Sequence, residues 1–470
     1  MRDYRLGFQS LGEELSDVVL PVEGRLPDWL EGVLLRAGPA LFEVEGRSYR
    51  HWFDGLGMLY RFGIGGGRVL YSNRLVRSRG YCDAMREGRI VHGEFATPPD
   101  HGPLGRIKEL MRRLAASNNA NVNVQRTATG TYALTETPDR VRFDPETLET
   151  LGTEPYADGI PGQVTTAHPL WDPERREWVN YLIHFGRRCS YRILTQGEAD
   201  TGRRELATVQ TDAPAYMHSF GLTDRFVILF ESPFRVSPLT LLLSGEPFIA
   251  NYRWRQGLPM RFHLIDRRDG SVRTLEAPPA FSFHQINAFD RPGEVVIDLC
   301  VYRDAEVIGE MTLSRLCGPH AANPLAAGRL VRYRLPLNGK EAVCEPLWDG
   351  ALELPRIRED RDARRDYTVA WGVGATMADS GFLDSLIRFD PRAGRPTARW
   401  HEPGTWPGEP VIVPAPDGTG AVLLSLVLDG ATGRSFLLVL EAGTLDELAR
   451  AWLPHPAPFG FHGQFYPAGA

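Results

Sequence analysis

Ile387-Arg388-Phe389-Asp390-Pro391-Arg392-Ala393-Gly394 contains the kind of unit that decides the fold of this chain. Alternating apolar residues predict a short strand, an Asp-Pro turn follows, and the chain returns through a glycine. Proline presets φ and glycine accepts a positive φ, so both favour tight turns between strands. Similar strand–turn–strand units occur at 60–70, 141–149, 262–272 and 331–339. Their repetition predicts an all-β fold built of hairpins.

The hairpin pattern continues without a linker through all 470 residues, which include 48 glycines and 36 prolines. This favours a β-propeller over several sandwiches, although the irregular spacing hides the number of blades. Strong helical periodicity is found in one place, residues 106–116. There the apolar residues follow the i, i+3, i+4, i+7 pattern of an amphipathic helix: Ile107, Leu110, Met111 and Leu114.

Composition narrows the class of protein. The net charge of −6, from 53 basic and 59 acidic residues, gives no bulk attraction to nucleic acid. Five cysteines without close pairs argue for a reducing compartment and against a disulfide framework or a thiolate zinc site. The first residues lack the pattern of a signal peptide, and no apolar stretch reaches the roughly 18 residues of a membrane span. We therefore expect a cytoplasmic protein.

Four of the 12 histidines lie in distinctive short contexts: Ala167-His168-Pro169, Met217-His218-Ser219-Phe220, Phe283-His284-Gln285 and Phe461-His462-Gly463. Neutral imidazole is a preferred ligand for zinc, copper, iron and nickel. Their separations of 50, 66 and 178 residues are far from any local metal motif, and each alone is compatible with a hydrogen-bonded structural histidine. In a propeller, however, the innermost strands converge on one axis. One histidine from each of four blades could then reach the same ion, and four imidazoles would suit ferrous iron with open positions for oxygen.

The chain resembles the carotenoid cleavage oxygenase family along nearly its whole length. The resemblance is carried by the four histidine contexts and by Pro27-Asp28-Trp29-Leu30-Glu31-Gly32, Arg36-Ala37-Gly38-Pro39, His51-Trp52-Phe53-Asp54-Gly55-Leu56-Gly57-Met58 and Gly460-Phe461-His462-Gly463-Gln464-Phe465. It implies one domain over residues 1–470, a seven-bladed β-propeller with short helices and loops forming a cap over the metal face. It also implies one Fe(2+) per chain, bound by His168, His218, His284 and His462.

The resemblance further implies three glutamates that each accept a hydrogen bond from a ligand imidazole: Glu136, Glu353 and Glu409. Such carboxylates fix the tautomer and the ring angle, and three of them would offset the charge of the dication. Thr135 stands where lignostilbene-cleaving members carry a lysine, which argues against phenolic stilbenes as substrates. Phe283 and Phe461 flank two ligands, and we expect them either to line a substrate tunnel or to pack in the core.

Within the family the chain is most similar to the branch of the animal β-carotene oxygenases and the retinal pigment epithelium isomerohydrolase, and we expect a bacterial member. The implied activity is that of a non-haem iron dioxygenase. It would use dioxygen to cleave a conjugated carbon–carbon double bond of a carotenoid or apocarotenoid into two aldehydes. The leading specific reaction is central 15,15′ cleavage of β-carotene to retinal. Two alternatives are an iron-dependent retinyl ester isomerohydrolase and a non-catalytic propeller that binds partner proteins.

A carotenoid substrate resides in bilayers, so we expect peripheral association with a membrane surface. The helix predicted at 106–116 has an apolar face flanked by basic residues, which is typical of an interfacial helix. A second apolar cluster follows Pro238: Leu239, Leu241, Leu242 and Leu243. The alternative for the helix is that its apolar face packs on the propeller.

Overall fold

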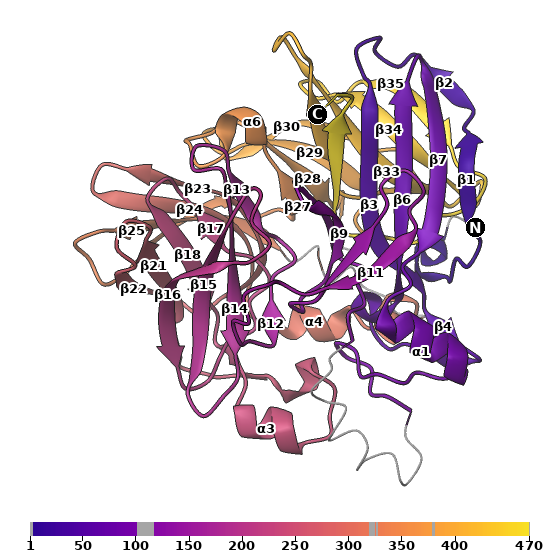
Figure 1. Cartoon of the computed structure of the whole chain (residues 1–470). Helices are drawn as coiled ribbons and strands as arrows, with labels where there is room; N and C mark the ends of the chain where they lie inside the picture. Colours follow the sequence, from indigo (N-terminus) through magenta and orange to yellow (C-terminus); the bar gives the residue numbers. More distant parts are fainter. Residues whose placement is uncertain (1–2, 101–116, 319–324, 326–327, 378–380, 470) are drawn as a thin grey trace.

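The computed structural model describes residues 3–100, 117–318, 325, 328–377 and 381–469, and within these ranges the chain is built mostly of β-strands (Figure 1). Seven antiparallel sheets of four to six strands form the blades of a β-propeller. The predicted seven-bladed architecture is therefore confirmed. The helix predicted at 106–116 lies outside the described residues.

Five blades are made of strands that follow one another along the chain, and their bounds are as follows. The first has β8 (Asn123–Thr127), β9 (Gly130–Leu134), β10 (Arg140–Phe143) and β11 (Thr150–Glu154). The next two have β12 (Val164–Thr165), β13 (Leu170–Asp172), β14 (Glu177–His184), β15 (Cys189–Gly197) and β16 (Arg204–Thr211), then β17 (Gly221–Leu222), β18 (Phe226–Glu231), β21 (Met260–Asp266) and β22 (Val272–Ala277). The last two have β23 (Phe281–Arg291), β24 (Glu294–Tyr302), β25 (Arg329–Pro336) and β26 (Val343–Trp348), then β27 (Glu353–Arg356), β28 (Ala370–Gly374), β29 (Ser385–Asp390) and β30 (Arg395–Trp400).

The other two blades join the two ends of the chain. One combines β1 (Leu15–Val19), β3 (Gly32–Leu41), β6 (Leu56–Gly65) and β7 (Arg68–Leu75) with the C-terminal β36 (Gly463–Pro467). The other combines the N-terminal β2 (Val22–Gly24) with β31 (Thr405–Pro407), β32 (Val411–Pro414), β33 (Ala421–Asp429), β34 (Arg434–Glu441) and β35 (Glu447–Trp452). Each end of the chain thus hydrogen-bonds into the other end's blade, with Val22 opposite Ala451 and Leu34 opposite Phe465. This double exchange of strands closes the ring of blades.

The hairpins predicted from the turns are confirmed. In the unit at 387–394, β29 pairs with β30, and Asp390 Oδ1 accepts hydrogen bonds from the backbone N–H groups of Arg392 and Ala393 in the turn. β6 and β7 are joined through Gly66 and Gly67. Their φ angles are 54° and 71°, values that residues with a side chain rarely adopt. The strands are strongly apolar, and the buried side chains of neighbouring blades pack against one another.

Short helices and loops gather at one end of the propeller, the lower end in Figure 1. This end holds α1 (Arg79–Glu87), α3 (Pro238–Leu243), α4 (Glu306–Glu310) and the small hairpin of β4 (Glu43–Val44) and β5 (Arg47–Ser48). The remaining short elements are α5 (Leu313–Leu316), α6 (Glu359–Asp362), η1 (Tyr4–Phe8), η2 (Trp52–Asp54), η3 (Ile249–Asn251), β19 (Phe234–Arg235) and β20 (Arg253–Trp254).

Sequence periodicity does not predict helix α1. Its two buried residues are Gly80 and Ala84, so it packs through small residues rather than through a stripe of large apolar ones. Its ends are nevertheless well defined. The Ser78 side chain accepts a hydrogen bond from the N–H of Tyr81, and Gly88 ends the helix in the left-handed conformation with φ 61°.

Candidate metal centre

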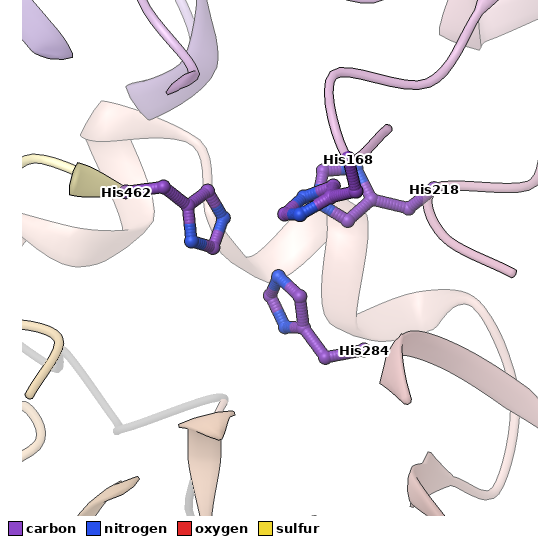
Figure 2. Close-up of side chains that lie close together, drawn as sticks. All are labelled: His168, His218, His284 and His462. Atoms are coloured by element: carbon purple, nitrogen blue, oxygen red, sulfur yellow. The ribbon is translucent and has the colours of Figure 1, made fainter. Parts of the chain in front are cut away.

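Four histidines converge on the propeller axis, each from a different blade (Figure 2). His168 lies between β12 and β13, His218 lies just before β17, His284 lies within β23, and His462 directly precedes β36. Two of these blades are direct neighbours, since β17 contacts β23, whereas β36 contacts β8 of the blade that carries Glu136. One nitrogen from each imidazole lies within 4.8 Å of the others. Histidines that lie up to 294 residues apart in sequence, His168 and His462, are thus brought together by the closure of the ring.

The three remaining blades each supply one of the predicted glutamates. Glu136 follows β9, Glu353 begins β27, and Glu409 lies between β31 and β32. The Nδ1–H groups of three imidazoles donate to these carboxylates: His218 to Glu136 at 2.6 Å, His284 to Glu353 at 2.7 Å and His462 to Glu409 at 2.7 Å. In the part of the chain that the structure describes, His168 has no carboxylate partner.

The donor set fits a divalent metal ion. A carboxylate on Nδ1 fixes the tautomer that leaves Nε2 unprotonated and free to act as a ligand. His284 Nε2 is buried without a hydrogen-bond partner, and His168 Nε2 lies only 3.1 Å from His218 Nε2. Burial lowers the pKa of both His168 and His462 well below the ordinary value, and the neighbouring imidazoles lower the pKa of each further. Neutral rings with inward, unpaired nitrogens are what a metal site requires.

Two tyrosines that sequence reasoning missed complete the environment of the glutamates. The Tyr302 hydroxyl donates to Glu353 at 2.6 Å, and the Tyr216 hydroxyl donates to Glu136 at 3.1 Å. Burial raises the pKa of both hydroxyls well above the ordinary value, so they remain donors. No sequence signal marks them, because each belongs to a different blade from the carboxylate that it contacts.

Two arginines that the sequence analysis did not identify give Glu409 a charge environment different from that of Glu136 and Glu353. Arg356 Nε donates to Glu409 Oε1 at 3.0 Å, and Arg36 lies 3.9 Å from Glu409 Oε2 while donating to the Glu409 carbonyl. Arg36 stands in the Arg-Ala-Gly-Pro motif and Arg356 follows Glu353 by three residues, so both could have been found by their motifs. The expectation that all three glutamates offset a dication therefore needs correction. Glu136 and Glu353 have no cationic side-chain partner among the described residues apart from their histidines, whereas Glu409 is already paired with arginine.

A cavity of about 1150 Å³ is lined by three of the four histidines, His218, His284 and His462. It exceeds the roughly 300–1,000 Å³ of most ligand pockets and suits a long substrate. Thr135, Phe283 and Phe461 all line it. Phe283 and Phe461 also belong to a buried aromatic cluster with Phe53, whose ring lies 5.2 Å from Phe461, so they both line the cavity and pack in the core.

Helix α3 forms part of the cavity wall and also faces solvent. Leu239, Leu242 and Leu243 are 68%, 54% and 75% exposed. Leu241 does not share this exposure, because the helical turn directs it toward the cavity and the buried aromatic cluster. The four apolar residues predicted in the helix at 106–116 lie outside the described residues. Among the helices that the structure describes, none is long and apolar enough to cross a membrane.

The chain is similar to known proteins of one family over almost its whole length. The family model described as retinal pigment epithelial membrane protein matches residues 8–467. The carotenoid isomerooxygenase of Galleria mellonella is 33% identical over 498 aligned residues, covering 99% of this chain and 97% of that protein. The human mitochondrial carotenoid-cleaving dioxygenase is 31% identical, with coverage of 95% and 88%. A variant of the Synechocystis apocarotenoid oxygenase superposes with a TM-score of 0.87 at 25% identity, covering 99% of both chains.

Proposed function

The chain belongs to the carotenoid cleavage oxygenase family, and from this premise we propose that it is an iron(II) dioxygenase that cleaves a carotenoid or apocarotenoid into two aldehydes. Our leading specific reaction is the central 15,15′ cleavage of β-carotene to retinal. The observation that carries the proposal is the set of four converging imidazoles, three of which are held by carboxylates and line a large cavity. Relatives named as carotenoid-cleaving enzymes support the substrate class.

In this proposal His168, His218, His284 and His462 hold one ferrous ion per chain, and Glu136, Glu353 and Glu409 orient three of the rings. A bound ferrous ion would provide the chemistry that activates the co-substrate, dioxygen. The protein supplies orientation and a dry environment. Phe283 and Phe461 exclude water beside the histidines, and Thr135 offers a small neutral wall to the polyene. Overall, one carbon–carbon double bond breaks and each of its carbons gains one oxygen atom.

Oxygen dependence tests this proposal directly. Iron is reconstituted anaerobically, and the holoenzyme is incubated in air with carotenoids, apocarotenals, stilbenes and retinyl esters. We expect polyene cleavage that stops under argon, and each aldehyde should carry label from isotopic dioxygen when exchange with water is controlled. Product mass then fixes the cleaved bond.

The same assay separates the alternatives. Undiminished turnover of a retinyl ester under argon would establish an isomerohydrolase instead. A protein that binds no iron and turns over no substrate would establish the non-catalytic propeller.

We also propose that the protein is cytoplasmic and associates peripherally with membranes, and that α3 contacts the lipid. Its exposed leucines lie beside the cavity, so a polyene could pass from the bilayer into the site without crossing water. Burial of one leucine in lipid contributes roughly 1.5–3 kcal/mol, and each 1.4 kcal/mol corresponds to a factor of about ten in affinity.

Replacing both Leu239 and Leu243 with aspartate should therefore reduce binding to anionic liposomes by at least about tenfold, measured by co-sedimentation. The matched control is Leu151→Asp, since Leu151 is 57% exposed and lies on β11 away from the cavity lining. The control should bind as the wild type does. Equal binding by the Leu239→Asp/Leu243→Asp variant would contradict the proposed contact.

A further inference from the structure

Strand β27 begins with Glu353, and a bulge interrupts the strand directly after this glutamate. The register between β27 and β28 shifts between Glu353 and Arg356, so that Leu354 and Pro355 together stand opposite Gly372. A β-bulge bends its strand and redirects side chains, and bulges are common next to active sites. The bulge of Leu354 and Pro355 therefore lies where it can set the direction of the Glu353 carboxylate.

The backbone of Leu354 has an unfavourable conformation. Its φ is 48°, which lies in the left-handed region that residues with a side chain rarely adopt. Pro355 adds a second conflict, because a proline pushes the residue before it toward an extended conformation with a negative φ. Strain of this kind persists only where the surrounding structure imposes it, and it is concentrated at functional sites.

Leu354 also has a distinctive location. It is 9% exposed, lines the cavity and belongs to the buried cluster that includes Phe283 and Tyr302. Six other described non-glycine residues have a positive φ, and none of them lines the cavity: Asp17, Glu45, Leu148, Arg176, Arg364 and Leu445. Among the described residues, Leu354 is therefore the one that combines this conformation with a place in the cavity wall.

The contacts of the bulge lead to Glu353. The N–H of Leu354 donates to Glu353 Oε2 at 3.3 Å, and the same oxygen accepts from His284 Nδ1 at 2.7 Å. The opposite strand approaches closely, because a Cβ added at Gly372 would lie 2.8 Å from the Glu353 carbonyl oxygen. The same Cβ would lie 2.5 Å from a methyl carbon of Leu352. The absence of a side chain at Gly372 thus allows β28 to pack against the backbone of Glu353.

We propose that the bulge and Gly372 form a positioning element of the metal centre, in which the left-handed backbone of Leu354, held against Gly372, aims the Glu353 carboxylate at His284. Leu354 and Gly372 are positioning residues, because they act on the metal through Glu353 and His284. The inference rests on the proposed function and adds two residues to its metal site. A carboxylate fixes the tautomer and the ring angle of a ligand imidazole, so an error in the aim of Glu353 lowers metal affinity.

The conformation of Leu354 can be tested without any metal. In an ordinary strand glycine is less stable than alanine, because glycine loses more conformational freedom on folding. At a φ of 48° the order reverses, since alanine has a steric penalty that glycine lacks. Urea denaturation of the metal-free proteins should therefore give Leu354→Gly a higher midpoint than Leu354→Ala.

The matched control for this comparison is Leu386 in β29, a fully buried leucine of the same blade without a positive φ. There the usual order should hold, and Leu386→Ala should have a higher midpoint than Leu386→Gly. The usual order at Leu354 as well would overturn the inference.

Cobalt(II) binding under argon tests the link to the metal centre, and it is followed by the visible absorption of the bound ion. Leu354→Val and Gly372→Ala should each weaken cobalt binding by about tenfold or more, as expected for loss of a group that supports a ligand. Valine is close to leucine in size, but its β-branched side chain opposes a positive φ. Leu386→Val removes the same methylene group elsewhere in the blade and should bind cobalt as the wild type does.

A double-mutant cycle shows whether Leu354 acts through Glu353. The Glu353→Ala protein has no carboxylate to aim, so adding Leu354→Val should change its cobalt affinity by less than about twofold. An equal loss with and without Glu353 would overturn the inference, as would wild-type affinity in both Leu354→Val and Gly372→Ala. Thermal melting shows which variants are folded, and the two substitutions lie on opposite strands, so either one decides if the other fails to fold. A wild type that binds neither cobalt nor iron would show that the proposed metal site itself is wrong, whereas unchanged affinity in the variants contradicts the positioning role alone.

Discussion

Replacing His168 with alanine should remove iron from the protein and lower polyene cleavage by at least about 100-fold. Loss of a group that only supports a ligand typically lowers affinity or activity by roughly 10–100-fold, and loss of the ligand itself should exceed that. Of the four substitutions, His168→Ala should disturb the rest of the protein least, because His168 has no carboxylate partner among the described residues that would be left unpaired. Iron content and steady-state turnover are measured on the same preparations. The other three His→Ala variants should lose iron as well.

His401→Ala is the matched control. His401 is exposed, and its ring contacts the Asp384 carbonyl at 2.9 Å rather than any member of the four-histidine group. This variant should keep one iron per chain and wild-type turnover. If His168→Ala retained full iron content and activity, His168 would not be a ligand and the four-imidazole site would be wrong.

The metal-free stability of these variants should differ in an informative way. His284→Ala leaves Glu353 buried without its imidazole, whereas His168→Ala strands no carboxylate. An unpaired buried charge is unfavourable. Urea denaturation of the metal-free proteins should therefore show a larger loss for His284→Ala than for His168→Ala. This order separates a role in metal binding from a general role in packing.

The fold was largely predictable because turn chemistry is local. Asp-Pro and glycine pairs act within four residues, so units such as 387–394 reveal hairpins wherever they occur. The number of blades was not predictable from spacing, because β2 and β36 pair with strands from the other end of the chain. It came from the family resemblance. Helix α1 escaped detection because it packs through Gly80 and Ala84, which leave no large apolar stripe.

The same distinction between local sequence signals and contacts across blades decides which site residues could be predicted. The four histidines and three glutamates could be named because each stands in a distinctive short motif that matches the family. Tyr302 and Tyr216 could not, since their contacts with Glu353 and Glu136 join separate blades and leave no mark in the local sequence. Arg36 lies in a quoted motif and Arg356 follows Glu353 by three residues, yet only their distances to Glu409 reveal that this carboxylate is already charge-paired.

That difference in charge pairing leads to unequal results for two otherwise similar substitutions. Glu353→Gln keeps a hydrogen-bond acceptor near His284 and removes one negative charge that faces the metal position. We expect iron affinity or turnover to fall about 10–100-fold. Tyr302 remains a hydrogen-bond partner and no arginine is stranded, so metal-free stability should change by no more than about 1 kcal/mol.

Glu409→Gln should lower iron affinity similarly but also destabilise the metal-free protein. Glu409 is 1% exposed, and its loss of charge leaves the buried Arg36 without its carboxylate and leaves Arg356 with Glu359 alone, whose side chain is largely exposed. Breaking a buried ion pair by removing one partner typically costs about 3–5 kcal/mol. Urea denaturation of both metal-free variants measures the difference, with Glu31→Gln as the exposed control.

Equal metal-free stability of Glu353→Gln and Glu409→Gln would show that the arginines are not held by Glu409. The expected inequality has a physical origin in the arrangement of blades. In the part of the chain that the structure describes, the partners of Glu136 and Glu353 beside their histidines are uncharged: tyrosine hydroxyls and, for Glu353, the N–H of Leu354. Their two negative charges are therefore available to balance a divalent cation. Glu409 instead forms ion pairs with Arg36 and Arg356, which lie in the blades of β3 and β27. It thereby links its own blade, that of β31–β35, to the blades on both sides while it accepts the hydrogen bond that orients His462.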